Sequence, residues 1–206
     1  MSLTVNTGAG KTTFVEILAG KNKSGSLTGS VQFPSHSTSN LRIGFVPQQD
    51  VLPSMLTVYE ALFFAAHLRL PETIREDDKH ARVQDMLMKL GLADVRNARI
   101  GSSDGNKRGI SGGEMRRVSI GLELIGCPDV LILDEPTSGE NTLCTHSLPI
   151  TKRDISFLGL DSVSAARVAA VLHSVAHDAQ NPIAVIASIH QPRSVLQILH
   201  RREPDI

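Results

Sequence analysis

Three short runs of the chain are apolar at nearly every position: residues 42–46, Val130–Leu133 and residues 183–187. A run of this kind predicts a strand that is buried on both faces, which is typical of a parallel sheet. Residues 1–5 are long enough only for the stub of another strand, and residues 31–33 read as a short strand within a polar loop. The pattern therefore favours an α/β fold with a mostly parallel sheet.

Other stretches carry apolar residues at helical spacing, as at Val58, Leu62 and Ala65. The predicted helices cover residues 12–19, 57–70, 82–90, about 110–125 and 161–175. Gly91 follows the third of these as a C-cap, and residues 71–79 read as a charged connection. Because helices follow one another between two strands without a strand among them, residues 57–125 are predicted to form an inserted helical subdomain.

Composition and charge narrow the class of protein. The 206 residues fit one domain with enough mass for a hydrophobic core. Twenty-one basic and twenty-one acidic residues cancel, and there are one Tyr and no Trp. The chain thus lacks the charge excess and the stacking aromatics of a nucleic-acid binder. No run reaches the roughly 20 apolar residues of a membrane span, and Cys127 and Cys144 lack metal-like spacing and are expected to stay reduced.

A glycine-rich stretch precedes the first predicted helix, and it reads Gly8-Ala9-Gly10-Lys11-Thr12-Thr13. Glycines let backbone amides approach a phosphate, and a helix N-terminus adds favourable partial charge. In such a loop Lys11 would reach the β- and γ-phosphates, and Thr12 would place its hydroxyl on Mg²⁺. The full pattern also asks for glycine where Val5 stands, so a chance Gly-Lys-Thr turn is the alternative.

Two carboxylates, Asp134 and Glu135, come directly after the strand at Val130–Leu133. Open parallel sheets bind ligands at the carboxyl ends of their strands, so these side chains are predicted to face a site. A strand that ends in a solvated acidic turn is the alternative. Together with the phosphate loop, the pair indicates a hydrolase that acts on a Mg²⁺-nucleotide.

Two further candidates lie elsewhere in the chain. Ser111-Gly112-Gly113-Glu114 opens a predicted helix and offers a second anion site, with an ordinary serine N-cap as the alternative. His190 stands just beyond the strand at residues 183–187. A lone histidine is usually structural, but one at the same sheet edge as the carboxylates is better interpreted as a γ-phosphate sensor.

Six of these motifs, in this order, resemble those of an ABC transporter ATPase. The Walker A motif corresponds to residues 8–13, the Q-loop to Gln48 and the signature to residues 111–114. The Walker B motif corresponds to residues 133–136, the D-loop to residues 160–162 and the H-loop to residues 188–193. Residues 116–121 and 188–192 are similar to the white/brown type, the G subfamily. The resemblance covers nearly the whole chain and implies a P-loop NTPase fold, an ABC-type ATP-binding domain over residues 1–206.

The resemblance implies a role for each motif within one site. Asp134 would hold Mg²⁺ together with Thr12 and Gln48, and Glu135 would act as the base toward the attacking water. His190 would fix the γ-phosphate. Gln48 would also sense that phosphate and relay its presence to a membrane domain.

The resemblance also implies partners. Two such domains would pair head to tail, so that Ser111 and Gly113 serve the nucleotide of the partner and Asp161 of the D-loop crosses to its site. ATP hydrolysis would power transport at the cytoplasmic face of a membrane, through a transmembrane domain that is absent from this chain. Nucleic acid is not expected as a partner.

The sequence departs from the family pattern in three places. The chain begins after the strands and the adenine-stacking aromatic that family members carry upstream, and its polar end replaces an expected strand, so it reads as truncated at both ends. Residues 140–159 separate Gly139 from Leu160, which are adjacent in the family. This insert is interpreted as a translated intron, with a tolerated surface loop as the alternative.

The sequence thus predicts the ATP-binding domain of a G-type ABC transporter, which binds and hydrolyses ATP. Two alternatives stay open. One is a non-transport ABC ATPase of the DNA-repair or translation type. The other is a non-functional fragment that binds nucleotide without turnover.

Overall fold

Four parallel strands form the centre of the molecule. The computed structural model describes residues 2–4, 10–21, 26, 28–29, 41–101, 109–136, 159–179 and 181–189, with the backbone alone for residues 2–4 and 159–163. The strands are β1 (Ser2–Thr4), β2 (Ile43–Val46), β3 (Val130–Leu133) and β4 (Ala184–Ile189), in the order β1–β4–β3–β2. Val46 is paired with Leu133, and Leu133 with Ala187, so three strands reach the same edge of the sheet. The predicted parallel α/β fold is confirmed.

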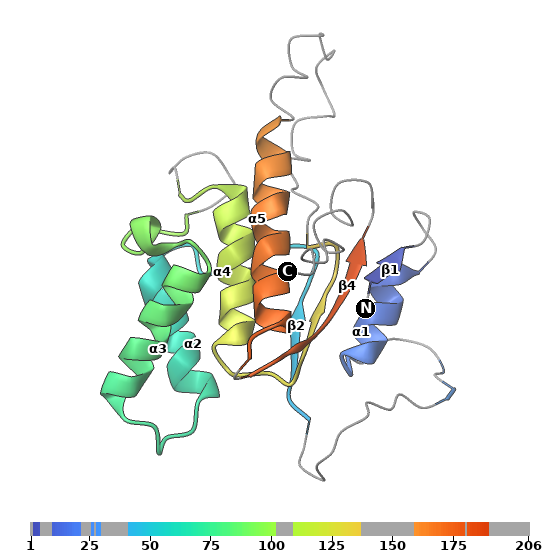
Figure 1. Cartoon of the computed structure of the whole chain (residues 1–206), viewed down its shortest axis with the longest axis horizontal. Helices are drawn as coiled ribbons and strands as arrows, with labels where there is room; N and C mark the ends of the chain where they lie inside the picture. The colour runs from blue at the N-terminus through green and yellow to red at the C-terminus, as the bar shows by residue number, and fades with distance from the viewer. Residues whose placement is uncertain are drawn as a thin grey trace, which may run out of the picture.

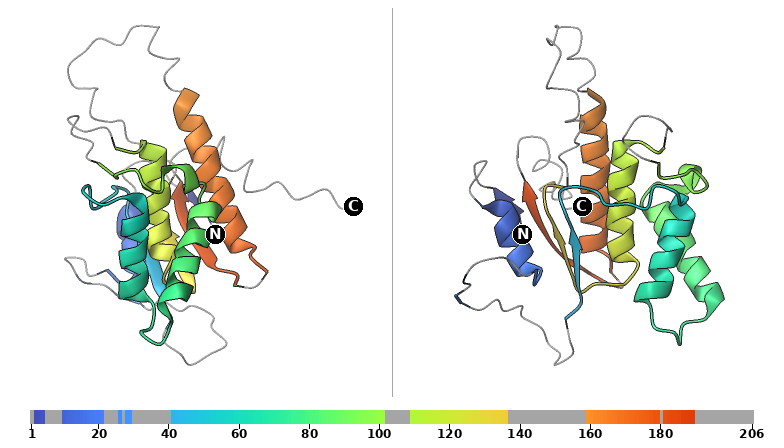
Figure 2. Two further views of the ribbon diagram at one scale, coloured as in Figure 1. Left: turned by 90° about the vertical axis from the view of Figure 1, so that its left-hand side faces the viewer. Right: turned by 180° about the vertical axis from the view of Figure 1, so that it is seen from behind.

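Helices cover both faces of this sheet. They are α1 (Lys11–Leu18), α2 (Val58–Arg69), α3 (Glu76–Lys89), α4 (Gly112–Leu124) and α5 (Gly159–Ala176), with a 3₁₀ turn η1 (Ala93–Val95) after α3. Helix α1 lies on one face of the sheet, and α4 and α5 lie on the other (Figure 1). Helices α2 and α3 form an outer layer against α4, as both views of Figure 2 show.

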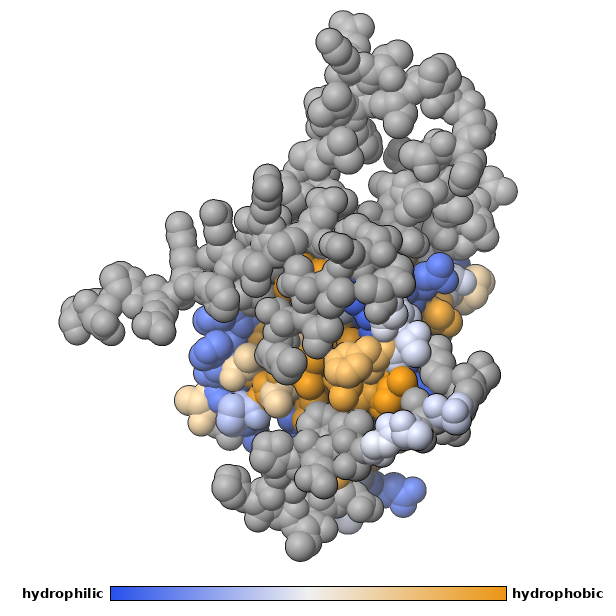
Figure 3. Space-filling model, turned by 90° about the vertical axis from the view of Figure 1, so that its right-hand side faces the viewer, coloured by the Kyte–Doolittle hydropathy of each residue, from blue (hydrophilic) through white to orange (hydrophobic). Residues whose placement is uncertain are grey.

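The two faces carry different cores. On the side of α4 and α5, a large cluster of buried residues extends from Leu131 and Leu133 through α4 into α2 and α3. On the side of α1, the described buried cluster consists of Val15, Val130 and Ile132. Seen from the side of α1, apolar residues gather in the middle of the molecule (Figure 3). The alternating side chains of β3 thus face two cores of unequal size.

Local sequence explains where two of the helices begin. The Thr57 hydroxyl accepts a hydrogen bond from the Glu60 amide, and the Glu60 carboxylate accepts one from the Thr57 amide. Ser111 and Glu114 form the same capping box at the start of α4. Each box pairs two amides that the helix itself leaves without partners. Such boxes fix the first residue of α2 and of α4.

A glycine lets the outer helices approach α4 closely. A Cβ atom at Gly121 would lie 2.5 Å from Cδ1 of Leu90 and 3.0 Å from Cδ2 of Leu62. Any larger residue at this position would therefore push against both α2 and the end of α3. The absence of a side chain at Gly121 sets the packing distance between the two helical layers.

The predicted elements differ from the observed ones mainly at their ends. Residues 76–79 were predicted as part of a charged connection, and this prediction is wrong because α3 already begins at Glu76. The first turn of α3 carries Glu76, Asp77 and Asp78, and acidic side chains stabilise a helix N-terminus. The predicted strand at residues 31–33 lies outside the described residues, and so does the insert at residues 140–159 except for Gly159, which begins α5.

The helices α2, α3 and α4 follow one another between β2 and β3, as the helical periodicity predicts. Their division into a subdomain at residues 57–125 stays a prediction, because α4 packs on β2 as well as on α2. Among the described residues, none of the helices has the length and apolar content needed to cross a bilayer.

Candidate functional site

The carboxyl ends of β2, β3 and β4 bring residues from distant parts of the chain to one edge of the sheet. Gln48 follows β2, Asp134 and Glu135 follow β3, and Ser188 lies near the end of β4. Lys11 joins them from the first turn of α1. Parallel topology predicts this meeting point, and the described side chains do converge there.

Asp134 is buried, with 1% of its surface exposed. Its Oδ1 accepts a hydrogen bond of 2.6 Å from the Ser188 hydroxyl, and its amide donates to the carbonyl oxygen of Val46. Its Oδ2 is buried and has no hydrogen-bond partner among the described residues. A buried carboxylate oxygen without a partner is costly unless a cation or a donor meets it. The residue is therefore held firmly, with one buried oxygen that no described residue contacts by a hydrogen bond.

Glu135 is bent out of the strand by an unusual backbone angle. Its φ is +45°, a conformation that non-glycine residues rarely adopt and that is common at functional sites. The Glu135 amide donates a 2.9 Å hydrogen bond to the Ser188 hydroxyl, which supports this turn. Its Oε2 accepts a 3.1 Å hydrogen bond from Nε2 of Gln48, and its Oε1 lies 3.8 Å from Nζ of Lys11. Three residues predicted for one site thus meet at this carboxylate.

The start of α1 has the form of an anion site. Gly10 is its N-cap, with φ +81°, and no described side chain caps the helix. A left-handed angle of this kind suits glycine, and the positive end of the helix dipole favours an anion at such a start. Lys11 is buried, whereas Thr12 and Thr13 are exposed. Gly8 and Ala9 lie outside the described residues.

The second candidate anion site lies on the other side of the sheet. Ser111 caps α4, which packs on the face opposite α1 (Figure 1). Gly112 is exposed and open, but a Cβ atom at Gly113 would lie 2.5 Å from Oγ of Ser164 in α5. Close packing against α5 therefore explains the glycine at position 113, and Ser111 is exposed.

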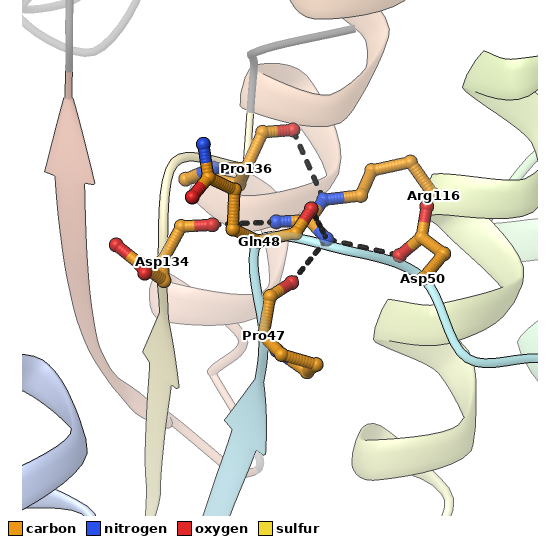
Figure 4. Close-up of polar contacts among 6 residues, drawn as sticks. All are labelled: Pro47, Gln48, Asp50, Arg116, Asp134 and Pro136. Carbon is orange, nitrogen blue, oxygen red and sulfur yellow. Dashed lines mark hydrogen bonds and ion pairs between the residues drawn. The ribbon is translucent and has the colours of Figure 1, made fainter. Parts of the chain in front are cut away.

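Arg116 is the main site residue that the sequence analysis missed. It is buried in α4, and its guanidinium donates hydrogen bonds to the carbonyl oxygens of Pro47 and Asp134 (Figure 4). It also forms a 2.9 Å ion pair with Asp50. The only signal in the sequence was an arginine on the turn after the serine cap, and nothing in that spacing shows what it contacts.

Arg117, the next residue, lies between α4 and α5 and is 3% exposed. Burial lowers its pKa below the usual value of an arginine, Glu114 partly opposes this effect, and Arg167 adds to it. Its Nε has no hydrogen-bond partner among the described residues. Its charge therefore interacts with Glu114 of α4 and Arg167 of α5.

Two predicted residues are not described. His190 and the side chain of Asp161 lie outside the described part of the chain, so their roles stay predictions. Within that part, groups of three or more His, Cys, Asp or Glu residues with metal-binding geometry are absent.

The comparisons with known proteins place the chain among ATP-binding cassettes. Residues 2–138 match the family model described as ABC transporter. The ABC transporter G family member STR of Medicago truncatula is 41% identical over 203 residues, which cover 97% of this chain and 22% of that protein. The ABC transporter G family member 22 of Arabidopsis thaliana is 41% identical over 197 residues, 94% of this chain and 23% of the relative. The chain thus spans less than a quarter of the length of these relatives.

Solved structures share the fold at low identity. A metal-chelate type ABC transporter in an inward-facing conformation has a TM-score of 0.65 and 20% identity, over 94% of this chain and 64% of that one. A dimeric ATP-binding cassette bound to ADP and Pi has a TM-score of 0.62 and 16% identity, over 96% of this chain and 75% of that one. At these identities the likeness shows the fold, which is that of a P-loop ATPase domain.

Proposed function

Because the chain belongs to the ABC transporter family, we propose that it is the nucleotide-binding part of a G-type transporter. It binds and hydrolyses ATP, and the free energy of hydrolysis drives transport through a membrane domain. One observation carries the proposal. Lys11, Gln48, Asp134 and Glu135 come from α1 and from the ends of two strands, and they meet at one edge of the sheet.

The chain's own groups have separate tasks in binding. The amides of the first turn of α1 donate to phosphate oxygens, and Lys11 adds a positive charge at the β- and γ-phosphates. Lys11 lies within ion-pair distance of Glu135, so the phosphates compete with that carboxylate for the same cation. ATP binding is thereby expected to release Glu135 toward the attacking water.

Glu135 then acts on that water. Its backbone is fixed by Ser188, and its side chain is oriented by the amide of Gln48. A carboxylate held in this way can accept a hydrogen bond from water and keep it in line with the γ-phosphate. Positioning of this kind supplies much of the acceleration of phosphoryl transfer, since misplacement by about 1 Å can cost about a hundredfold in rate.

The donor set at the sheet edge fits Mg²⁺. The buried Oδ2 of Asp134, which has no partner among the described residues, would be one ligand, and the hydroxyl of Thr12 and the side chain of Gln48 would supply neutral oxygens. When bound, Mg²⁺ offsets the negative charge that develops on the phosphate oxygens. Asp134 accepts from Ser188 through its other oxygen, and this bond fixes the direction in which Oδ2 points.

The proposal includes a second ATP-binding domain. Helix α4, which Ser111 caps, lies on the face of the sheet opposite α1, so Ser111 is proposed to serve a nucleotide other than the one at Lys11 of its own chain. A head-to-tail pair would let Ser111 and Gly113 serve the nucleotide of the partner, with Asp161 crossing between the sites. Residues 57–125 form the helical subdomain in this proposal, and residues 140–159 form an insert before the D-loop.

Calorimetry of Mg-ATP binding tests the proposal. Lys11→Ala should weaken binding by about 1.5–3 kcal/mol, the range for a hydrogen bond that involves a charged group. Lys21→Ala is the matched control, because Lys21 lies over the ring of Phe45, just beyond the other end of α1. Equal affinity of the parent and Lys11→Ala would contradict the assignment of residues 8–13.

A further inference from the structure

One buried arginine of α4, Arg116, lies at the carboxyl ends of β2 and β3. Arg116 is 6% exposed, and its Nη1 donates hydrogen bonds of 2.5 Å to the carbonyl oxygen of Pro47 and 3.3 Å to that of Gln48. The same nitrogen lies 2.9 Å from Oδ1 of Asp50. The guanidinium therefore holds the main chain on both sides of the Gln48 side chain.

The same guanidinium holds the end of β3. Its Nη2 donates a 2.8 Å hydrogen bond to the carbonyl oxygen of Asp134, and its Nε donates a 3.4 Å hydrogen bond to that of Pro136. These two carbonyls flank Glu135, whose φ of +45° bends the chain at this point. Figure 4 shows the guanidinium lying between the two strand ends, with bonds to both.

Asp134 is consequently held at three points. Its amide donates to the carbonyl oxygen of Val46, its carbonyl accepts from Arg116, and its Oδ1 accepts from Ser188. The remaining group, Oδ2, is the oxygen that the proposed function assigns to Mg²⁺. Arg116 does not itself reach that oxygen, so any influence on it passes through the backbone of Asp134.

Only arginine suits these contacts. Its planar guanidinium carries five N–H groups in a fixed fork, whereas lysine presents three donors on one atom. A buried cation is costly unless it is paired and fully hydrogen-bonded, and Asp50 supplies the one carboxylate among its described acceptors. Because most of the acceptors are main-chain carbonyl oxygens, these hydrogen bonds fix the position of the backbone after β2 and β3.

We infer that Arg116 is a positioning residue that sets the orientation of Asp134 and Gln48 for Mg-ATP and ties both to α4. The inference rests on the proposed function. The N-terminus of this helix carries Ser111, which the proposal assigns to the nucleotide of the partner. A displacement of α4 on partner binding is thereby transmitted to the strand ends through one rigid side chain.

Calorimetry with ATP, in the presence of Mg²⁺ and in the presence of EDTA, tests the inference in the full chain. The ratio of the two affinities measures how much Mg²⁺ strengthens binding. Arg116→Met keeps the apolar stem and removes the charge and the donors, so this ratio should fall by at least about tenfold, as for other changes behind a metal ligand. Affinity in EDTA should stay within about twofold, because Lys11 and the amides of α1 are untouched.

Arg69→Met is the matched control. Arg69 forms a two-bonded ion pair with Glu123 of α4, two turns after Arg116, and does not bond to the residues at positions 47–50 or 134–136 among its described contacts. Its loss should leave the Mg²⁺ ratio at the parental value. Arg116→Lys should give an intermediate ratio, and it decides by the same criterion if Arg116→Met fails to fold. A parental ratio in the Arg116 variants, or an equal loss in Arg69→Met, overturns the inference alone. Absence of ATP binding by the parent overturns the proposed function and the inference together.

Discussion

The two faces of the sheet differ in how they are held. On the side of α4 and α5, 23 buried residues form one cluster that continues into α2 and α3. On the side of α1, the described cluster has three buried residues, with partly buried neighbours such as Leu18 and Phe45. Burial of apolar surface contributes about 25 cal/mol per Å², so among the described residues the first face supplies the larger share of this stabilisation.

The proposed site contains residues from both faces of the sheet. The Asp134 amide bonds to Val46 of the large cluster and Arg116 belongs to α4, whereas Lys11 belongs to an eight-residue helix on the small cluster. Segments with few buried contacts open locally more often than the rest of a domain. Nucleotide binding is therefore expected to stabilise α1 far more than it stabilises the outer helices.

The largest effect is expected from a cavity in the large cluster. Leu62 is fully buried in α2 and lies near Gly121 of α4, so Leu62→Ala should lower the free energy of unfolding by about 2–5 kcal/mol. Urea unfolding followed by circular dichroism measures this change. A loss below about 1 kcal/mol would mean that the outer helices contribute little to the domain.

A matched pair of valines sharpens the comparison. Val118 in α4 and Val15 in α1 are both 0% exposed, and they belong to the large and the small cluster respectively. Each loses two methyl groups on mutation to alanine, which is worth about 1.6 kcal/mol of burial. Val118→Ala should cost more in global stability than Val15→Ala, because part of α1 opens independently. Equal losses in urea unfolding would contradict the unequal support of the two faces.

A smaller effect is expected at the cap of α2. Thr57→Ala removes the hydroxyl that accepts from the Glu60 amide and should cost about 1 kcal/mol. Helix α2 contributes buried residues to the large cluster, so the loss of its cap should lower the free energy of global unfolding. Thr73→Ala, at an exposed position between α2 and α3, is the control and should be close to neutral.

The smallest effect is a pH dependence at the same cap. Hydrogen bonds from the Thr57 backbone and hydroxyl lower the pKa of Glu60 below its usual 4.5. A carboxylate with a lowered folded-state pKa stabilises the fold fully above pH 4.5 and loses this contribution as the pH falls through the folded pKa. The difference in urea midpoint between the parent and Glu60→Gln should thus shrink below pH 4.5. A difference that stays constant down to pH 3 would exclude this linkage.

Much of the fold follows from patterns that are local in sequence. Uninterrupted apolar runs identify β2, β3 and β4, and the motif Ser111 to Glu114 identifies the start of α4. The start of α3 was missed because its first turn is charged throughout, and periodicity of apolar residues says nothing about such a turn.

The part of the site that follows from the parallel arrangement of the strands was predictable. Asp134, Glu135 and Gln48 follow strands, so the sequence places them at one sheet edge. The bonds of Arg116 could not be predicted, because its partners after β2 lie 66 to 69 positions away from it in the sequence. The partnership of Ser188 with Asp134 depends on the register of β3 and β4, which the sequence alone does not reveal.

The most direct test of this account is hydrogen exchange with and without Mg-ATP. At a ligand concentration about 100 times the Kd, binding stabilises the bound form by about 2.7 kcal/mol, so amides of α1 that exchange by local opening should slow by about a hundredfold. Amides of α2 and α3 that exchange by local opening should keep their rates, because these helices lie in the outer layer away from α1. Saturation with Mg-ATP that leaves the exchange of α1 unchanged, or that slows only α2 and α3, would contradict a phosphate site at the start of α1.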